Sequence, residues 1–332
     1  MSPFHYSLGM IGGAPNSAVG YAHYTASQMD GMWEVKAGCF SRHEQQNEEA
    51  AKKYGVSIER TYTNLEKFIE YEKNRLDAVV LLSPTDLHFE MALSCMQAGI
   101  PVISEKALAT SLDEVATLEK KRLETKSFLT VVYNYSGYPM VREVRRLIND
   151  GILGNLLHFQ AEMPQEGYLR TNSKGEPMIP QDWRLLEGEI PKIHLDLAVH
   201  LHQLIHYLTS ARPLEVIAYQ SSRGWFDVID NVSCLAKYTS DLEGQFWFSK
   251  CALGHRNGLR IRLYGTNASV EWYQLNPEEV FISYADGRRE VLDRSINESI
   301  ASESRYSRFK SGHPAGFVEA LANLYWDFAF AL

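Results

Sequence analysis

Residues 8–20 read Leu8-Gly9-Met10-Ile11-Gly12-Gly13-Ala14-Pro15-Asn16-Ser17-Ala18-Val19-Gly20, a glycine-rich stretch near the start of a 332-residue chain. An apolar run over 6–11 precedes the turn, and a helix-like run over 18–29 follows it. Strand, tight glycine turn and helix is the geometry that directs backbone N–H groups and a helix N-terminus toward a phosphate. The stretch therefore predicts a first domain built around a dinucleotide.

The stretch fits the dinucleotide fingerprint G-x-G-x-x-G only in part. Counted from Gly12, the second and third positions hold Ala14 and Ser17, with Gly13 between the first two; in a lengthened turn the third glycine is Gly20. The methyl group of Ala14 stands where the backbone should come closest to a pyrophosphate. Two interpretations stay open, a dinucleotide-binding turn and a glycine-rich turn that binds nothing.

The composition is that of an ordinary globular chain of about two domains. Apolar residues make up 45% and charged residues 22%, which excludes wholesale disorder. The net charge of −8 argues against non-specific binding to nucleic acid or to an anionic membrane. No apolar run approaches ~20 residues, and the N-terminus lacks a basic region followed by an apolar one. We expect neither a membrane span nor a secretory signal.

The four cysteines lie far apart in apolar segments and form no C-x-x-C pair: Cys39, Cys95, Cys234 and Cys251. This usage is typical of free thiols in a reducing compartment rather than of a disulfide or zinc framework. We therefore expect a cytoplasmic protein.

The first 135 residues alternate strand and helix patterns, which predicts a parallel sheet with helices on both faces. The expected strands are 6–11, 34–40, 78–82, 101–104 and 128–133. After residue 154 the strand patterns follow one another too closely for crossover helices, so the second sheet should be large and mostly antiparallel. Its strands are expected at 156–163, 214–220, 232–238, 244–252, 259–264, 269–273 and 280–284.

Two helices accompany the second sheet, at 196–209 and 316–330, and the polar stretch 165–181 is predicted to be a surface loop and a candidate lid. The change of pattern predicts two domains. We assign 1–135 to cofactor binding and 136–332 to substrate binding and oligomerisation.

Two of the expected parallel strands end in residues with ligand-binding chemistry, and ligands of such sheets bind outside the carboxyl ends of strands. The second strand ends in Ser41-Arg42 with no carboxylate for a ribose hydroxyl, so Arg42 favours a 2′-phosphate and hence NADP. A solvated surface arginine is the equal alternative. Another strand ends in Glu105-Lys106, where a lysine can stabilise a developing alkoxide; a surface salt bridge is the alternative.

A histidine cluster lies on the predicted helix 196–209. Asp196 and His200 are i and i+4 and share one helix face, which suits a general base beside a carboxylate. His194, His202 and His206 make a metal site conceivable, but the spacing is not that of H-E-x-x-H, and we expect no metal. Histidines packed in the core are the third interpretation.

These motifs occur together, and in this order, in the Gfo/Idh/MocA family (glucose–fructose oxidoreductase, inositol dehydrogenase and relatives), which the chain resembles over nearly its whole length. The resembling segments are the glycine turn, Ser83-Pro84-Thr85-Asp86-Leu87-His88, Glu105-Lys106-Ala107, Asp196 with His200, and Gly312-His313-Pro314-Ala315-Gly316-Phe317. The resemblance implies a Rossmann domain followed by an α/β domain whose open sheet forms homodimers or homotetramers. The apolar strand 245–248 fits such a buried face.

The resemblance also implies an NAD(P)-dependent oxidoreductase acting on a secondary alcohol of a sugar, nucleotide sugar or cyclitol. Lys106 would contact nicotinamide and the reacting hydroxyl, His200 would be the general base, and Asp196 would orient both substrate and base. The cofactor-binding set would be Gly12, Gly13, Ala14, Ser17, Ser41, Arg42, Ser83, Pro84, His88, Glu105 and Lys106. The substrate contacts would be Tyr135, Trp183, Arg184 and His313.

The chain departs from the family pattern at Ala107, where the family has proline, and at the altered glycine turn. Many relatives also continue beyond the position of Leu332, so a truncated chain and a short family member are both compatible with the sequence. Two further functions compete with the dehydrogenase: a glycosidase that uses bound NAD for transient oxidation, and a cofactor-binding regulator without turnover.

Overall fold

The computed structural model describes residues 5–297 and 299–332. Their contacts divide the chain into two compact units, each with its own sheet. The first unit comprises residues 1–134 and 317–332, and the second comprises residues 135–316.

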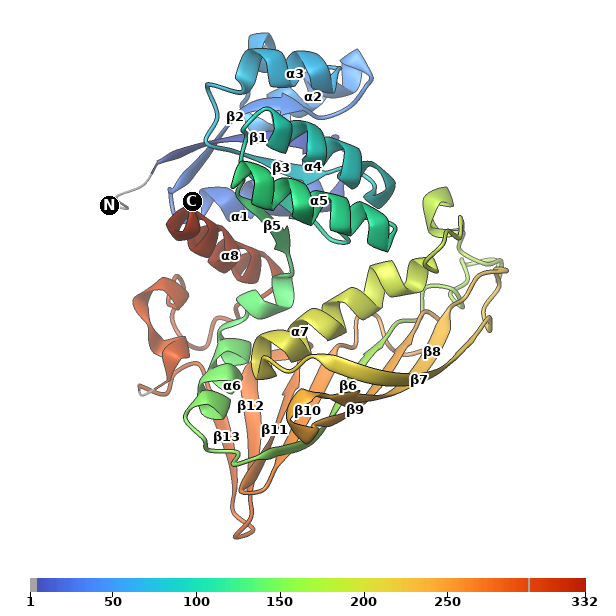
Figure 1. The fold of residues 1–332 in the computed structure, drawn as a ribbon, viewed down its shortest axis with the longest axis vertical. Coiled ribbons are helices and arrows are strands. Elements are labelled where there is room, and N and C mark those ends of the chain that lie inside the picture. Colours follow the sequence, from blue (N-terminus) through green and yellow to red (C-terminus); the bar gives the residue numbers. More distant parts are fainter. Residues whose placement is uncertain (1–4, 298) are drawn as a thin grey trace. The chain divides into compact units, whose positions relative to one another are not determined.

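In the described part of the first unit, a five-stranded parallel sheet has the order β2-β1-β3-β4-β5 (Figure 1). The strands are β1 (Tyr6–Gly12), β2 (Trp33–Cys39), β3 (Ala78–Leu82), β4 (Val102–Glu105) and β5 (Leu129–Val132). All five residues of β3 are buried, as expected of a strand covered on both faces. The strand order reverses between β1 and β3, which is where ligands of open parallel sheets bind. The predicted parallel sheet is confirmed.

Helices cover both faces of this sheet. They are α1 (Ala18–Gln28), α2 (Glu44–Tyr54), α3 (Leu65–Glu72), α4 (His88–Gln97), α5 (Leu112–Thr125) and α8 (Phe317–Ala331). Side chains of α1, α2 and α8 pack into one apolar core, and those of α3, α4 and α5 pack into the other.

The last helix, α8, packs with the first unit, although the sequence prediction placed all of 136–332 in the second domain. Leu321, Tyr325 and Phe328 enter the core that α1 and α2 share, and the Trp33 indole N–H donates to the Tyr325 carbonyl at 2.9 Å. The sequence did not predict that α8 packs with the first unit, because the apolar pattern of a helix does not indicate which sheet the helix covers.

The second unit is built on an eight-stranded sheet with the order β13-β12-β11-β10-β6-β9-β8-β7. Its strands are β6 (Leu156–Pro164), β7 (Pro213–Ser221), β8 (Asn231–Tyr238), β9 (Glu243–Ser249), β10 (Arg260–Gly265), β11 (Ala268–Tyr273), β12 (Asn276–Tyr284) and β13 (Arg289–Asp293). The sheet is antiparallel except for the β6–β9 pair. The predicted, mostly antiparallel sheet is confirmed; β13 was not predicted.

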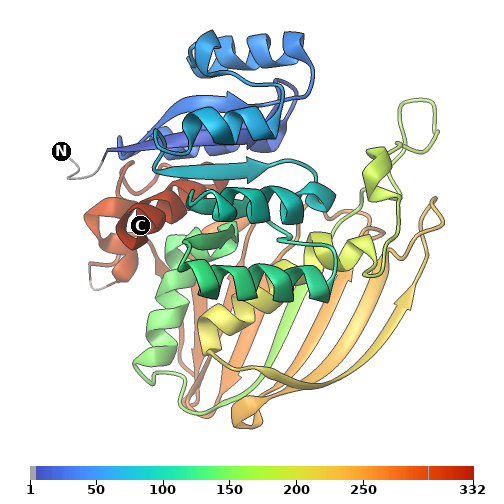
Figure 2. The ribbon, with the colours of Figure 1, turned by 45° about the horizontal axis from the view of Figure 1, so that its top comes forward.

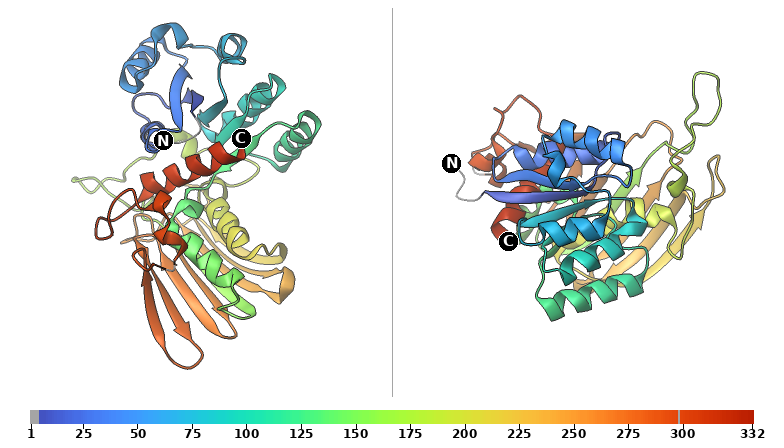
Figure 3. Two further views of the ribbon diagram at one scale, coloured as in Figure 1. Left: turned by 90° about the vertical axis from the view of Figure 1, so that its left-hand side faces the viewer. Right: turned by 90° about the horizontal axis from the view of Figure 1, so that it is seen from above.

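Two helices, α6 (Pro139–Asn149) and α7 (Val199–Thr209), lie on one face of this sheet (Figures 2 and 3). The sequence reading missed α6 because it falls where the domain boundary was placed. On the covered face, aligned apolar residues of five neighbouring strands form the core: Phe246, Ala161, Ile261, Trp272 and Val280.

The opposite face of the sheet carries a ladder of charged and polar side chains. Glu271 pairs with Arg260 at 2.6 Å and with Arg262 at 2.8 Å, and Arg262 reaches Glu162 at 3.3 Å. The prediction that strand 245–248 supplies an apolar outer face is wrong for Phe246 and Phe248, which are buried on the helix-covered face. Side chains alternate along a strand, so three consecutive aromatic residues cannot share one face.

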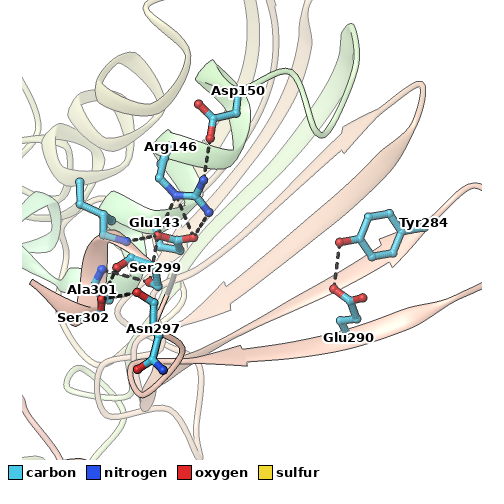
Figure 4. A network of polar contacts seen from close by, with 10 residues as sticks. Glu143, Arg146, Asp150, Tyr284, Glu290, Asn297, Ser299, Ala301 and Ser302 are labelled. Carbon is cyan, nitrogen blue, oxygen red and sulfur yellow. Dashed lines mark hydrogen bonds and ion pairs between the residues drawn. The ribbon is translucent and has the colours of Figure 1, made fainter.

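A buried carboxylate on α6 fixes the segment that leads to α8 (Figure 4). Glu143 accepts hydrogen bonds from the Ser299 hydroxyl at 3.0 Å and from the Ile300 backbone N–H at 2.9 Å. Arg146 compensates its charge from the same helix and bridges to Asp150 at 2.6 Å. The buried Glu143 carboxylate, with its charge compensated, thereby holds the turn at Ser299 and Ile300 against α6.

Candidate functional site

The glycine turn of the first unit depends on close backbone approach. Gly12 and Gly13 have φ of +86° and +79°, values that favour glycine. A Cβ on Gly12 would lie 2.6 Å from the Leu82 carbonyl carbon, and one on Gly20 would lie 2.6 Å from the Gly13 Cα. Gly20 therefore permits close packing of α1 against the turn, as the third glycine of the fingerprint does. The turn is longer here than in the fingerprint.

Side chains hold the turn in place from both sides. Ser17 caps α1 by accepting the Gly20 N–H at 3.0 Å. From α2, the Lys53 ammonium donates to the Pro15 carbonyl and the Tyr54 hydroxyl to the Gly13 carbonyl, both at 2.9 Å. The turn is thus a fixed backbone concavity at a helix N-terminus, and its residues fit a dinucleotide phosphate.

The end of β2 is organised by a buried amide. The Asn47 side-chain oxygen accepts the backbone N–H groups of Phe40 at 2.9 Å and Ser41 at 3.0 Å, while its nitrogen donates to the Ser41 carbonyl. The Arg42 side chain that follows is exposed. Asn47 is therefore a structural support of this strand end that the sequence prediction missed.

The turn after β3 is tied to the turn after β4 by one histidine. His88 is 1% exposed, and its ring nitrogens lie 2.9 Å from the Ser83 carbonyl and 2.7 Å from the Ala107 carbonyl. These two contacts join the loop that carries Pro84 to the turn after β4, and a direct contact of His88 with the cofactor stays a prediction. The Lys106–Ala107 peptide bond is cis.

At the end of β4, Glu105 lies between two donors. One carboxylate oxygen is 2.9 Å from His23 Nε2, and the other accepts the Lys106 backbone N–H at 3.0 Å. Burial alone would raise the pKa of Glu105, but the hydrogen bond from His23, the charge of Lys106 and the hydrogen bond from the Lys106 backbone N–H lower it below its ordinary value. The Glu105 carboxylate is therefore ionised directly beside Lys106.

In the second unit, the predicted helix at 196–209 begins earlier and with a different winding. Residues His194–Ala198 form one π-helical turn that runs into α7. Such turns are inserted rarely and often at functional sites. Here the π-turn carries Asp196, and the first turn of α7 carries His200, which is 6% exposed.

Asp196 is flanked by two cations. Its Oδ2 atom lies 2.6 Å from the Arg184 guanidinium and 2.5 Å from the ammonium of Lys250, which also donates to Gln165 Oε1 at 2.7 Å. Lys250 is 7% exposed and directly follows β9. Charge-assisted hydrogen bonds of this kind are short and fix the carboxylate's orientation.

The same polar network extends to Tyr135. Gln165 donates to Asn257 at 3.0 Å, and Asn257 donates to the Tyr135 hydroxyl at 2.9 Å. The Tyr135 ring meets the His200 ring edge to face, with centroids 4.9 Å apart. Burial raises the pKa of Tyr135 far above its ordinary value, so the hydroxyl stays protonated.

The other predicted residues of this unit have different surroundings. The Arg184 guanidinium carbon lies 4.3 Å from the centroid of the Trp183 ring, so these two predicted substrate contacts stack on each other. His313 is exposed, and its carbonyl accepts a hydrogen bond from Arg294 at 2.9 Å. Its backbone is thereby anchored within the segment before α8.

Three histidines near Asp196 each have separate neighbours. His194 lies 3.3 Å from Gln220, His202 lies 3.3 Å from the Tyr238 hydroxyl, and His206 lies 3.1 Å from the Ala211 carbonyl. Burial, followed by the charge of His194, lowers the pKa of His202. Among the described residues, no group of three or more His, Cys, Asp or Glu side chains is placed to hold a metal ion.

The sequence reading missed Gln165, Lys250 and Asn257, which connect Asp196 to Tyr135. Only Lys250 carried a signal: an ammonium group at the end of the apolar run 246–248 is unusual for a strand that packs in a core.

Two family models match successive parts of the chain. The model described as "Oxidoreductase family, NAD-binding Rossmann fold" matches residues 7–133, and "GFO/IDH/MocA C-terminal domain" matches residues 141–271. The chain belongs to the Gfo/Idh/MocA family of oxidoreductases. The resemblance read from the motifs is confirmed.

Individual members of the Gfo/Idh/MocA family are distant from this chain. The "Uncharacterized oxidoreductase YfiI" of Bacillus subtilis is 26% identical over 97% of this chain and 84% of its own length. The levoglucosan dehydrogenase of Pseudarthrobacter phenanthrenivorans is 23% identical over 63% of this chain and 58% of its own length. An inositol dehydrogenase homologue from Azotobacter vinelandii, solved with NADH and myo-inositol, has a TM-score of 0.89 at 26% identity, covering 99% of this chain and 86% of that one.

This family member is an NAD(P)-binding oxidoreductase, and its distant homologues include inositol and levoglucosan dehydrogenases. Across residues 5–297 and 299–332, no helix has the length and apolar character needed to cross a membrane.

Proposed function

We propose that this Gfo/Idh/MocA protein transfers a hydride between a nicotinamide dinucleotide and a secondary alcohol of a sugar, nucleotide sugar or cyclitol. The observation that carries the proposal is the partly buried network around Asp196, which ties a carboxylate, two cations and a tyrosine hydroxyl to the helix that bears His200. Such convergent polar groups suit a ligand rich in hydroxyls.

The nicotinamide dinucleotide, when bound, supplies the two-electron acceptor or donor. The backbone concavity at Gly12 and Gly13 and the N-terminus of α1 would hold its pyrophosphate. Pro84 follows β3, Glu105 ends the neighbouring strand β4, and both would face the nicotinamide ribose.

The acid–base work falls to three side chains. His200 takes the hydroxyl proton of the substrate in the oxidising direction and returns it in the other. Lys106 donates to the same oxygen and stabilises the negative charge that develops as the proton leaves. Asp196, held by Arg184 and Lys250, orients the substrate and His200.

Substrate binding falls to the rest of the Asp196 network. Tyr135 and Asn257 present donors and acceptors to hydroxyl groups, and the stacked pair Trp183–Arg184 offers an apolar ring face beside a charge. His313 remains a weaker proposed contact.

The first experiment is a tryptophan-fluorescence titration of the purified protein with NADH and with NADPH, followed by assays of cyclitols, sugars and nucleotide sugars. We expect binding of at least one nucleotide and turnover of a polyol. Lys106→Ala and His200→Ala should each reduce kcat by more than about 100-fold while nucleotide affinity is retained. Full activity in either variant contradicts the assignment.

The same experiment separates the rival functions. A glycosidase that oxidises its substrate transiently would release free sugar with no net reduced cofactor. A regulator would bind nucleotide without any turnover, and a turn that binds nothing would leave both titrations flat.

The choice between the two dinucleotides is proposed to rest on Arg42, with a slight preference for NADP. A 2′-phosphate offers this exposed guanidinium a bidentate partner. If so, Arg42→Ala weakens NADPH binding about tenfold or more and leaves NADH binding unchanged; an equal effect on both nucleotides removes the preference.

We propose a cytoplasmic homodimer or homotetramer assembled through the open sheet. Nearly every residue of the edge strand β7 is exposed, including Val216, Ile217 and Tyr219, and a groove beside it is lined by Leu235 and Trp247. An apolar edge of this kind is normally covered. Light scattering after size exclusion gives the mass, and Ile217→Asp should shift it toward 37.8 kDa.

A further inference from the structure

A chain of hydrogen bonds joins the last helix of the first unit to the end of β4. His23 on α1 is 1% exposed, and its Nδ1 atom lies 2.9 Å from the Tyr325 hydroxyl of α8. Its Nε2 atom lies 2.9 Å from Glu105, whose other oxygen accepts the Lys106 backbone N–H at 3.0 Å. Three segments far apart in sequence therefore meet at the residue before Lys106.

Along this series of hydrogen bonds, Tyr325 donates to His23 and His23 donates to Glu105. An ionised carboxylate only accepts hydrogen bonds, so the proton of the His23–Glu105 contact sits on Nε2. Burial, together with the charge of Glu105, holds the pKa of Tyr325 well above its ordinary value, so the hydroxyl keeps its proton and can donate to Nδ1. Every polar atom on the path is then satisfied.

The groups that face Glu105 come from four elements. They are His23 of α1, Tyr325 of α8, Tyr133 after β5 and Lys106 of its own strand end. Burial raises the pKa of Glu105, and both tyrosines stay neutral because burial and the Glu105 charge raise their pKa values. His23 is therefore the donor from another element that offsets the cost of burying this charge.

We propose that His23, oriented by Tyr325, is a positioning residue that keeps Glu105 ionised and thereby holds the backbone and the charge of Lys106 in place for the reaction. The proposal rests on the proposed function of Lys106. It gives α8 a part in catalysis: the helix supplies the hydroxyl that fixes the tautomer and orientation of His23.

The variants are chosen to separate positioning from packing. His23→Leu removes the donor to Glu105, whereas His23→Gln retains both a donor and an acceptor. Tyr325→Phe keeps the ring and removes only the hydroxyl. The control is Trp33→Phe, which removes another hydrogen bond to α8, the one from the Trp33 indole to the Tyr325 carbonyl, and keeps the Tyr325 hydroxyl and the His23 imidazole that lead to Glu105.

In His23→Leu the desolvation of Glu105 is no longer offset, so its pKa rises and the carboxyl takes up a proton at higher pH. We expect the acidic limb of the kcat profile, measured in the reducing direction where protonated His200 is the active acid, to move up by about one pH unit, with kcat about tenfold lower at its optimum. His23→Gln should recover most of both losses, and Tyr325→Phe should show a smaller shift in the same direction. Trp33→Phe should lower thermal stability and leave the limb unchanged.

A second readout does not require turnover. With ¹⁵N-labelled histidine, the resonance that disappears in His23→Gln should report a protonated Nε2. With ¹³C-labelled glutamate, the Glu105 carboxyl, assigned through Glu105→Gln, should titrate below the ordinary value of 4.5 in the wild type and higher in His23→Leu.

The two readouts distinguish the failure of this proposal from the failure of the proposed function. If no substrate turns over but the Glu105 titration moves as expected, His23 does keep Glu105 ionised, and the proposed dehydrogenase function is wrong. If the Glu105 titration is the same in wild type and His23→Leu, or if Trp33→Phe shifts the acidic limb equally, His23 is only a packing residue and the proposal is wrong.

Discussion

The glycine turn of the first unit is formed mainly by backbone groups, whereas the Asp196 network of the second is formed by side chains. The turn is made of backbone: two glycines at positive φ, a helix cap, and carbonyl groups that accept from Lys53 and Tyr54. The Asp196 network is made of side chains from several segments, with two cations on one carboxylate oxygen. A backbone site tolerates changes of sequence that keep its path, whereas a side-chain network depends on each member.

The difference explains why the departures at Ala14 and in turn length leave the architecture of the first unit intact. Strand β1, the turn and α1 meet with the close packing that Gly12 and Gly20 permit, although the fingerprint spacing is altered. Variants in the two regions should therefore fail in different ways. Changes in the turn should act through steric overlap and nucleotide affinity, and changes in the network through lost charge pairing and turnover.

Among the variants that compare the turn with the Asp196 network, the largest effect on stability is expected for Gly12→Ala. The new Cβ would lie 2.6 Å from the Leu82 carbonyl carbon at a φ of +86°, so strain and steric overlap act together. We expect the free energy of unfolding to fall by more than about 2 kcal/mol and nucleotide affinity to drop at least tenfold, measured by denaturant titration and fluorescence. Gly99→Ala is the matched control: its φ is +78° with nothing within 4 Å, so strain alone should cost about 1 kcal/mol. Equal losses in both variants would mean that close approach at Gly12 is unimportant.

Lys250→Met tests the side-chain network. It removes one of the two cations on Asp196 and leaves Gln165 without this donor, at a buried position. We expect a loss of about 2 kcal/mol in stability and at least tenfold in kcat/KM, with nucleotide affinity unchanged. Lys237→Met, an exposed lysine of the same sheet, should leave both unchanged. A weakened nucleotide affinity in Lys250→Met would contradict the expectation that the Asp196 network affects turnover and the glycine turn affects nucleotide binding.

The sequence predicted the two sheets and the positions of most strands, because local apolar periodicity and glycine turns decide these. It did not predict that α8 returns to the first unit, because that depends on which apolar surface remains uncovered after residue 316. The same limit applies to the candidate site. Asp196, Arg184 and Tyr135 stood out as motif residues, but the network that joins them runs through Lys250 and Gln165, whose proximity arises from strand pairing far along the chain.

The smallest expected effect compares two helix caps in the first unit. The Ser17 hydroxyl accepts the Gly20 N–H at 3.0 Å, and the Ser111 hydroxyl accepts the Glu114 N–H at 3.2 Å. Each serine-to-alanine change should cost about 1 kcal/mol, because one N–H at a helix start loses its acceptor. If the glycine turn holds the pyrophosphate, Ser17→Ala also weakens nucleotide binding several-fold, because the cap fixes the first turn of α1, whereas Ser111→Ala costs stability alone. Equal nucleotide affinities in the two variants, at equal stability loss, would separate the start of α1 from the nucleotide and leave β3 and β4 as the strands that carry the binding.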